Sequence, residues 1–399
     1  HANNVKDLTE AFTSIIGRVQ SSASSFTSPT YKVDPSSYLA HSDEIFLPVF
    51  MRTPNARWQG NLKKFKLENG VIVGKSDTNP TQTAVDAKGQ FLDSAWDFWG
   101  STASGSNVAE GGAASLLEPA NRVALTNNTS SLIPLDNTIT KAELGDAAMS
   151  DAEHDAVIQF AKGYDDDGSA LNYLGDIMNS KPVIMHDVNN KSYVLAGSND
   201  GYLHAFDADS GLEKWAFMPN VLLKNLKALK DNGITQQHLY GVDGPLTIWY
   251  DDKNNDGQIK KDEGEGIYVY FGLRRGGRAY YALDITDMND TAYPKLAWQF
   301  SHTTAGFNNL GESWSKPVMA KLRVADSNAS SGSVVKDVLV IGGGFDPILE
   351  NQDANTRLTH SIGNDVYMVD AHTGELIWSL RNNVSSASLD LKHSVPGDI

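Results

Sequence analysis

The clearest copy of a repeated unit reads Gly201-Tyr202-Leu203-His204-Ala205-Phe206-Asp207-Ala208-Asp209-Ser210-Gly211-Leu212-Glu213-Lys214-Trp215. An apolar strand pattern over 193–197 precedes it, a second one ends at Asp207, a turn follows, and the next strand pattern carries Trp215. Related strings occur over 267–298 and 338–378. The spacing from the Asp to the Trp is the same in 207–215 and 370–378, and the middle copy is widened by residues 288–294.

Repeats of about 40–50 residues, each a small antiparallel sheet, are typical of a β-propeller. Each sheet leaves an apolar face that a neighbouring sheet must cover, and closing the ring removes exposed edges. We therefore predict an all-β fold, a modified quinoprotein-like β-propeller of about five to seven blades. A β-sandwich with chance similarity is the alternative, although sandwiches do not require a repeated Asp-turn-Trp unit.

Apolar residues at helical spacing predict one amphipathic helix over 4–19, and a Ser-rich linker over 21–28 follows. That helix either packs on its own domain or binds a partner, and the first reading is favoured. Period-two patterns predict strands over 44–50 and 61–67, the second half-buried, with a hairpin turn at 69–70. We expect residues 1–45 to be an N-terminal helix and linker and 46–399 to be the propeller domain.

Residues 76–150 are rich in Gly, Ala, Ser, Thr and Asn and are predicted to be a loop-rich insertion. Trp96 and Trp99 are expected to anchor it to the main body. A short helix is predicted over 151–163, with Ser150 as N-cap and Glu153 completing a capping box.

The composition excludes several classes of protein. The formal net charge of −16 argues against binding to nucleic acid or to an anionic membrane surface, because both select basic patches. The absence of cysteine excludes disulfides, cysteine nucleophiles and thiolate zinc sites. No apolar run is long enough for a transmembrane helix, and no signal peptide is visible.

A candidate metal site lies at Asp252-Lys253-Asn254-Asn255-Asp256-Gly257-Gln258-Ile259-Lys260-Lys261-Asp262-Glu263, which matches the EF-hand loop template. Calcium takes oxygen ligands, which points to Asp252, Asn254, Asp256, the carbonyl oxygen of Gln258 and a bidentate Glu263. Lys260, at the ninth position, cannot ligate. A metal-free, Asx-rich turn is the alternative. Strand patterns over 246–250 and 267–271 flank the loop, so we expect it to staple a β-hairpin rather than to act as a helical switch.

Three weaker candidates for functional sites are interpreted as structural features. Asp165-Asp166-Asp167-Gly168 is interpreted as an acidic turn rather than a second cation site. The run 342–344 lacks the Lys-Ser/Thr of a phosphate loop and is read as a turn. Arg274-Arg275-Gly276-Gly277-Arg278 is interpreted as a salt-bridged loop, with contact to an acidic partner as the alternative.

Four segments resemble the β-propeller region of the PilC/PilY family of type IV pilus biogenesis factors and tip-associated adhesins of Gram-negative bacteria. They are Arg57-Trp58-Gln59-Gly60-Asn61-Leu62-Lys63-Lys64-Phe65, Leu174-Gly175-Asp176-Ile177 with Ser180-Lys181-Pro182, residues 198–207, and Gly311-Glu312-Ser313-Trp314-Ser315-Lys316-Pro317. The resemblance implies a calcium loop, here at 252–263, and a calcium-dependent influence on pilus extension and retraction. The family's loop often has an aspartate where this chain has Lys260, which leaves open whether Asp262 or Glu263 closes the shell.

By this resemblance the chain is the C-terminal region of an exported, non-enzymatic protein of the fimbrium that acts in pilus assembly, adhesion and virulence. Its expected location is the outer membrane, the cell surface or the pilus tip. Pilin subunits and a host-cell surface ligand are the expected partners. A quinone-dependent dehydrogenase and a non-adhesive scaffold propeller are the alternatives, because a fold alone does not fix function.

Overall fold

The computed structural model describes residues 25–26, 30–33, 41–77, 81–235, 237–325, 331–351, 362–383 and 391–399. The predicted helix over 4–19 lies outside these ranges. The described chain is mostly β, in several antiparallel sheets, which confirms the predicted fold class. None of its described helices is both long and apolar enough to cross a membrane.

The chain divides into two compact units. The first comprises His1–Thr126, Ile133–His186 and Asn190–Tyr240, and the second comprises Asn127–Leu132, Asp187–Asn189 and Gly241–Ile399. Each unit is described by itself below. The predicted boundary at 45/46 stays a prediction.

One sheet of the first unit is built around a long hairpin. It contains β1 (Ser25–Phe26), β2 (Thr30–Val33), β3 (His41–Met51), β4 (Gln59–Glu68), β5 (Val71–Gly74), β6 (Gln82–Thr83) and β9 (Leu174–Gly175). Asn69 and Gly70 have φ values of 51° and 79°, the left-handed conformation that a two-residue hairpin turn requires. The predicted strands and turn are therefore confirmed.

The prediction that the second of these strands is half-buried was wrong for its central part. Residues 60–65 of β4 are all buried, Lys63 and Lys64 included. Lys63 Nζ donates to Ser104 Oγ at 2.9 Å and to the Asn107 carbonyl at 2.7 Å. Lys64 Nζ lies 2.6 Å from a Glu44 carboxylate oxygen. Lys63 is held by hydrogen bonds and Lys64 by an ion pair, and these contacts offset the cost of burying each lysine.

The second sheet of this unit orders its strands β10-β11-β12-β13-β7-β8. Its strands are β7 (Ala124–Asn127), β8 (Leu132–Pro134), β10 (Val183–His186), β11 (Ser192–Gly197), β12 (Leu203–Asp207) and β13 (Glu213–Phe217). The helical elements are η1 (Ala113–Leu116), α2 (Asp151–Lys162), η2 (Asn220–Asn225) and α3 (Leu226–Asp231). In α2, Ser150 and Glu153 form both bonds of the predicted capping box.

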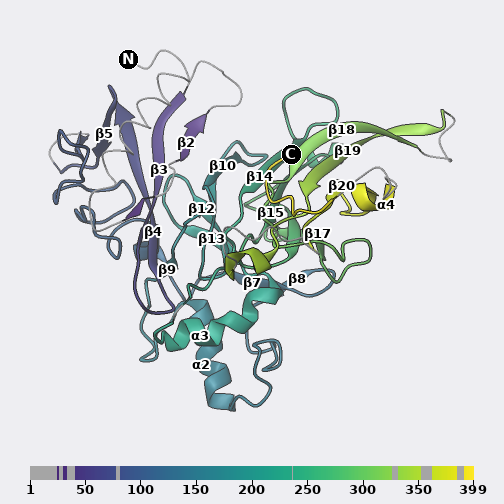
Figure 1. Ribbon diagram of the computed structural model, residues 1–399. Helices are drawn as coiled ribbons and strands as arrows, with labels where there is room; N and C mark the ends of the chain where they lie inside the picture. Colours follow the sequence, from purple (N-terminus) through teal and green to yellow (C-terminus); the bar gives the residue numbers. More distant parts are fainter. Residues whose placement is uncertain are drawn as a thin grey trace. The chain divides into compact units, whose positions relative to one another are not determined.

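Two four-stranded antiparallel sheets form the second unit. The first contains β14 (Leu246–Asp251), β15 (Gly266–Gly272), β16 (Ala279–Asp284) and β17 (Lys295–Ser301), with η3 (Lys261–Glu263) between β14 and β15. The other contains β18 (Val318–Ala325), β19 (Ser333–Gly342), β20 (Val366–Asp370) and β21 (Leu376–Ser379), with η4 (Pro347–Asn351) and α4 (Leu380–Asn383). β18 and β19 extend past β20 as a long hairpin (Figure 1).

Strand order follows chain order in both of these sheets and in β10–β13, as in propeller blades. The first strands of the three sheets begin at Val183, Leu246 and Val318. Each sheet with its connections is therefore longer than the repeat of roughly 40–50 residues that the sequence suggested. The described part of 180–399 accordingly holds three such sheets, whereas a repeat of about 40–50 residues predicts roughly five in this range. Long hairpin loops and the β18–β19 extension account for the additional residues.

The repeated Asp forms the same turn in two of the copies. Asp207 Oδ1 accepts hydrogen bonds from the backbone amides two and three residues ahead, at 3.0 and 2.9 Å. Asp370 Oδ1 makes the equivalent bonds at 3.0 and 3.2 Å. In the widened middle copy, Asp284 receives the first of these bonds, at 3.1 Å. These Asx turns explain why an Asp ends each of these strands.

A tryptophan from another sheet packs on this turn in the second unit. Trp298 Nε1 on β17 donates to the Ala371 carbonyl at 2.8 Å. A Cβ on Gly374 (φ 69°) would lie 2.8 Å from the Trp298 ring, so the ring needs the glycine's open space. The aromatic core around it includes Tyr270, Phe300 and Tyr367.

The first unit repeats this arrangement with Trp99, which comes from the loop-rich region. Trp99 Nε1 donates to the Ala208 carbonyl at 3.2 Å, and a Cβ on Gly211 would lie 2.6 Å from the indole ring. The ring also packs against Phe46 and Phe206. The predicted anchoring role of Trp99 is confirmed, and the anchor is the same tryptophan-on-turn contact that the repeat uses.

Candidate metal centre

The predicted loop lies in a β-hairpin, as expected. β14 and β15 pair antiparallel from Leu246↔Phe271 to Asp251↔Gly266. The two ends of the loop are therefore held together by the last paired residues of the hairpin. Asn255 and Gly257 have φ values of 58° and 80°, which turn the chain back on itself. Asp252 accepts hydrogen bonds from the backbone amides of Asp256 and Gly257, at 3.2 and 2.8 Å.

Three of the predicted ligands lie together on the exposed side of the loop. Asn254 Nδ2 donates to Glu263 Oε2 at 2.7 Å and to Asp256 Oδ2 at 3.3 Å. Lys260 Nζ forms an ion pair with Asp256 Oδ2 and lies 3.4 Å from Glu263 Oε1. The carboxylates of Asp256 and Glu263 therefore converge on one positive charge, which the chain itself supplies, and the Asn254 amide links the two carboxylates.

This pairing shifts the pKa of both partners. The hydrogen bond from Lys260, followed by the backbone bond from Gln258, lowers the pKa of Asp256. The same bond to Asp256 raises the pKa of Lys260. Both groups stay charged over the neutral range. The Lys260 ammonium thus lies between two of the predicted ligands, and a metal that bound there would have to compete with it.

The donor set fits calcium in its chemistry. It consists of oxygen atoms, which a hard cation prefers, and two carboxylates already converge on one positive charge. Within the described ranges no group of three His, Cys, Asp or Glu side chains is arranged to hold a metal. Here Asp252 faces backbone amides and Lys260 stands between the other two carboxylates, so ligation requires Lys260 to move away. The five ligands stay a prediction, with Asp252, Asn254, Asp256 and Glu263 supplying side chains and Gln258 its carbonyl oxygen.

The structure bears on which acid closes the shell. Glu263 contacts Asn254 and Lys260, whereas Asp262 is exposed and contacts none of the predicted ligands in the described part of the chain. Glu263 is therefore the better placed of the two. η3 sets this difference, because its single turn directs neighbouring side chains apart.

Sequence reasoning missed Glu265, which holds the loop from beneath. Its side chain is buried and accepts hydrogen bonds from three backbone amides of the loop: Lys253 at 2.9 Å, Lys260 at 3.0 Å and Asn254 at 3.3 Å. Lys261 adds an ion pair to Asp287 at 2.6 Å. The only sequence signal was an acidic residue beyond the template, next to the strand. The loop is therefore held partly by the protein alone.

Replacing Glu265 by alanine is expected to loosen the loop while leaving the predicted ligands in place. The amides of Lys253, Asn254 and Lys260 lose their acceptor, so their hydrogen exchange should become faster. Exchange measured by NMR tests this, with Asp262→Ala as the control. Unchanged protection of the three amides in Glu265→Ala would show that this carboxylate does not hold the loop.

The acidic candidate at 165–168 has a structural role in the described chain. Asp165 and Gly168 form a tight turn, with the Gly168 amide donating to the Asp165 carbonyl at 2.9 Å, and Asp166 pairs with Lys230.

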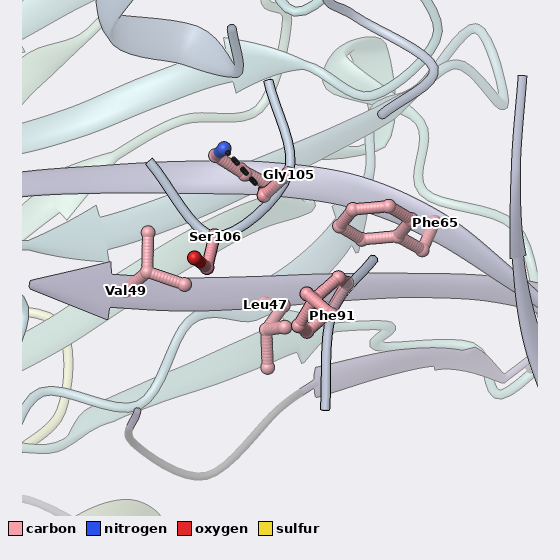
Figure 2. A pocket seen from close by; sticks show the side chains of 7 residues that line it. Leu47, Val49, Phe65, Phe91, Gly105 and Ser106 are labelled. Atoms are coloured by element: carbon pink, nitrogen blue, oxygen red, sulfur yellow. Dashed lines mark hydrogen bonds between the residues drawn. The ribbon is translucent and has the colours of Figure 1, made fainter. Parts of the chain in front are cut away.

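An apolar hollow lies beside Gly105 and Ser106 and is lined by Leu47, Val49, Phe65 and Phe91 (Figure 2). Lys63 also borders it, and burial lowers the pKa of this lysine to about 8. Its three hydrogen bonds hold the 104–107 segment over the sheet.

Antiparallel sheets with repeated tryptophan-on-turn contacts define a protein of the β-propeller class. Comparison with known families agrees: residues 168–346 match the PilY1 beta-propeller domain. This segment is therefore similar to the PilY1 β-propeller domain, and the chain shows distant homology to type IV pilus biogenesis factor PilY1.

The curated relatives are pilus proteins. A type IV pilus biogenesis factor PilY1 homologue of Xylella fastidiosa is 30% identical over 46% of this chain and 16% of its own length. Type IV pilus biogenesis factor PilY1 of Pseudomonas aeruginosa (strain UCBPP-PA14) is 30% identical over 37% of this chain and 14% of its own length. The chain therefore spans about a sixth of the length of these relatives.

Two solved structures show local similarity. The Pseudomonas aeruginosa PilY1 C-terminal domain aligns with 48% of this chain and 30% of its own, at 25% identity and a TM-score of 0.30. A quinohemoprotein alcohol dehydrogenase of Pseudomonas putida aligns with 47% of this chain and 25% of its own, at 18% identity and a TM-score of 0.22.

Proposed function

We propose that this chain is the calcium-binding propeller region of an exported type IV pilus biogenesis and adhesion factor. In this proposal it acts in pilus assembly, in the balance of extension and retraction, and in surface attachment, with pilin subunits and a host-cell surface ligand as partners. The homologues support a pilus role and are not enzymes. The observation that carries the calcium part is the convergence of Asp256 and Glu263 on one cation.

The chain's own residues set how the loop responds to metal. Calcium would supply a dication that neutralises the crowded carboxylates. Lys260 must release Asp256 and Glu263 for this, so its ammonium acts as a built-in competitor and weakens the affinity. Glu265 holds the loop close to the required shape in either state. The predicted consequence is graded tightening of the hairpin rather than its folding from a disordered state.

Calorimetric titration of calcium into metal-free protein is expected to give one binding event that Asp256→Ala abolishes. Lys260→Gln is expected to bind calcium more tightly than the parent, because the competing charge is gone. At calcium concentrations about a hundredfold above Kd, a site present only in the folded form stabilises the fold by about 2.7 kcal/mol. Thermal unfolding with and without a chelator measures this difference.

Asp166→Ala is the matched control, since it removes an exposed aspartate from a turn outside the loop. An isotherm that Asp256→Ala leaves unchanged would remove this loop from the proposal. Weaker binding in Lys260→Gln than in the parent protein would contradict the competition argument.

Different measurements distinguish the proposed function from its two alternatives. A quinone-dependent dehydrogenase would show a new absorbance band when the purified protein is mixed with a quinone cofactor, and we expect none. A scaffold without an adhesive role would bind purified pilins but not host cells. We expect binding to both, and loss of both on deletion of the propeller from the exported protein would support the proposed role.

A further inference from the structure

The arginine-rich turn after β15 contains a backbone conformation that is unusual for its side chain. Arg274 has φ 51°. The five other non-glycine residues with positive φ in the described chain are all asparagine, which tolerates this region far better than arginine. Two glycines follow after Arg275, at 276–277, so the turn already contains residues suited to such geometry. A strained arginine at this position points to a use for its side chain.

The Arg274 side chain lies on an aromatic platform. Its guanidinium carbon is 4.3 Å from the ring centroid of Trp314, and that of Arg275 is 5.2 Å away. Phe345 stacks on Trp314 with centroids 4.5 Å apart. Backbone bridges Arg274↔Ser313 and Glu312↔Phe345 hold the three segments side by side. The platform is thus fixed by the backbone.

The three arginines of this turn differ in their interaction partners. Arg275 forms an ion pair with Glu350 at 2.7 Å, and Arg278 donates to the Leu310 carbonyl at 2.8 Å. Arg274 Nε is buried without a hydrogen-bond acceptor, and no carboxylate in the described residues lies within ion-pair distance of this side chain. A buried donor of a charged group without an acceptor is costly, and an anionic ligand would satisfy it.

We propose that Arg274, Arg275 and Trp314 form a binding site for a carboxylate of an acidic peptide segment. A guanidinium presents paired donors that match the two oxygens of a carboxylate. Trp314 and Phe345 offer apolar surface to the carbon chain of an Asp or Glu side chain. A guanidinium also recognises phosphate, so inorganic phosphate is included as a competitor in the test below.

Glu312 makes this site sensitive to pH. Burial, and then the Glu350 charge, raise the pKa of Glu312 to about 7, against the hydrogen bond from Trp314 Nε1 and the charges of Arg275 and Arg278. Below that pH Glu312 is neutral and tolerates an incoming carboxylate. Above it, Glu312 is negatively charged and repels one.

The test is fluorescence anisotropy of a rhodamine-labelled Asp-Glu-Asp-Glu peptide amide titrated with the full chain at constant ionic strength. We expect it to bind more tightly than the matching Asn-Gln-Asn-Gln peptide. Arg274→Gly is expected to weaken binding about tenfold or more, as for loss of a charge-assisted hydrogen bond. Glycine accepts positive φ, so this variant should unfold no earlier than the parent, and loss of binding cannot be ascribed to misfolding.

Arg52→Gln is the matched control, because Arg52 also lies over a tryptophan, Trp58, in the first unit. It should leave binding unchanged. Binding should weaken up to about tenfold from pH 6 to pH 8 as the protonated fraction of Glu312 falls. Glu312→Gln should remove this pH dependence.

Equal affinity for the two peptides, or full affinity in a folded Arg274→Gly protein, would overturn the proposal. So would stronger displacement of the probe by inorganic phosphate than by glutarate at equal concentration, since the site would then select phosphate. A pH dependence that persists in Glu312→Gln would show that Glu312 is not the group that makes binding sensitive to pH. None of these outcomes depends on calcium binding, so the two proposals fail separately.

Discussion

Replacing Arg122 by leucine is expected to lower the free energy of unfolding by about 3–5 kcal/mol, as for other broken buried ion pairs. Arg122 Nε donates to Glu213 Oε2 at 2.8 Å, and both side chains are only 5% exposed. Without Arg122, the carboxylate of Glu213 is left buried with a single remaining partner, His204 Nδ1 at 2.7 Å. The cost arises from the uncompensated charge rather than from the lost bond.

The pKa shifts agree with this strong coupling. Burial alone raises the pKa of Glu213, yet the neighbouring Arg122 charge holds it below its ordinary value. Burial likewise works against the charged form of His204, but the nearby carboxylates of Asp200, at 3.6 Å, and Glu213, at 2.7 Å, raise its pKa. The network continues to Ser198 Oγ, 2.9 Å from His204 Nε2. The side chains of all of these groups are buried, so we interpret the network as structural.

Guanidinium-induced unfolding followed by tryptophan fluorescence measures this effect. Lys141→Leu is the control, because it breaks an ion pair to Asp151 whose side chains are 32% and 96% exposed. Solvent screens that pair, so its loss should produce no measurable change. If Arg122→Leu unfolded at the same denaturant concentration as the control, the network would not hold the first unit together.

Replacing Trp298 by alanine is expected to cost about 3–5 kcal/mol, the range for a buried large aromatic residue. Its ring is 6% exposed and stacks between Tyr270 and Phe300, with centroids 5.6 and 5.4 Å away. The change leaves a cavity beside Gly374 and removes the indole donor to the Ala371 carbonyl.

The same unfolding measurement applies, with Trp378→Ala as the matched control. Trp378 occupies the corresponding position of the last repeat, but its ring is only half-buried in the described structure. We expect a clearly smaller loss there. Similar losses for both tryptophans would mean that repeat position alone, and not packing on the neighbouring turn, sets the contribution.

The features that sequence predicted well depend on short-range patterns. The hairpin at Asn69-Gly70, the capping box at Ser150 and the loop between β14 and β15 each require only residues within a few positions of one another. Those contacts recur in many proteins, so local residue types are enough to recognise them.

The features that sequence missed join distant parts of the chain. Arg122 and Glu213 are separated by 91 residues, and nothing near either one indicates the other. β4 was expected to have one face in solvent, yet Lys63 reaches segment 104–107, which covers that face. Glu265 lies just outside the loop template, although it holds the loop by three amides. Such partners become visible only when the tertiary fold brings them together.

The contact between Trp99 and Ala208 has a consequence for folding during synthesis. The two residues are 109 positions apart, so the indole leaves the ribosome well before the turn that receives it. Until residues 207–211 emerge, this aromatic ring has no native place to bury. Closing so long a loop is entropically costly and slow. The first unit can therefore complete its core only after residues 207–211 have left the ribosome, and a nascent chain stalled before this turn would expose an aromatic surface that chaperones bind.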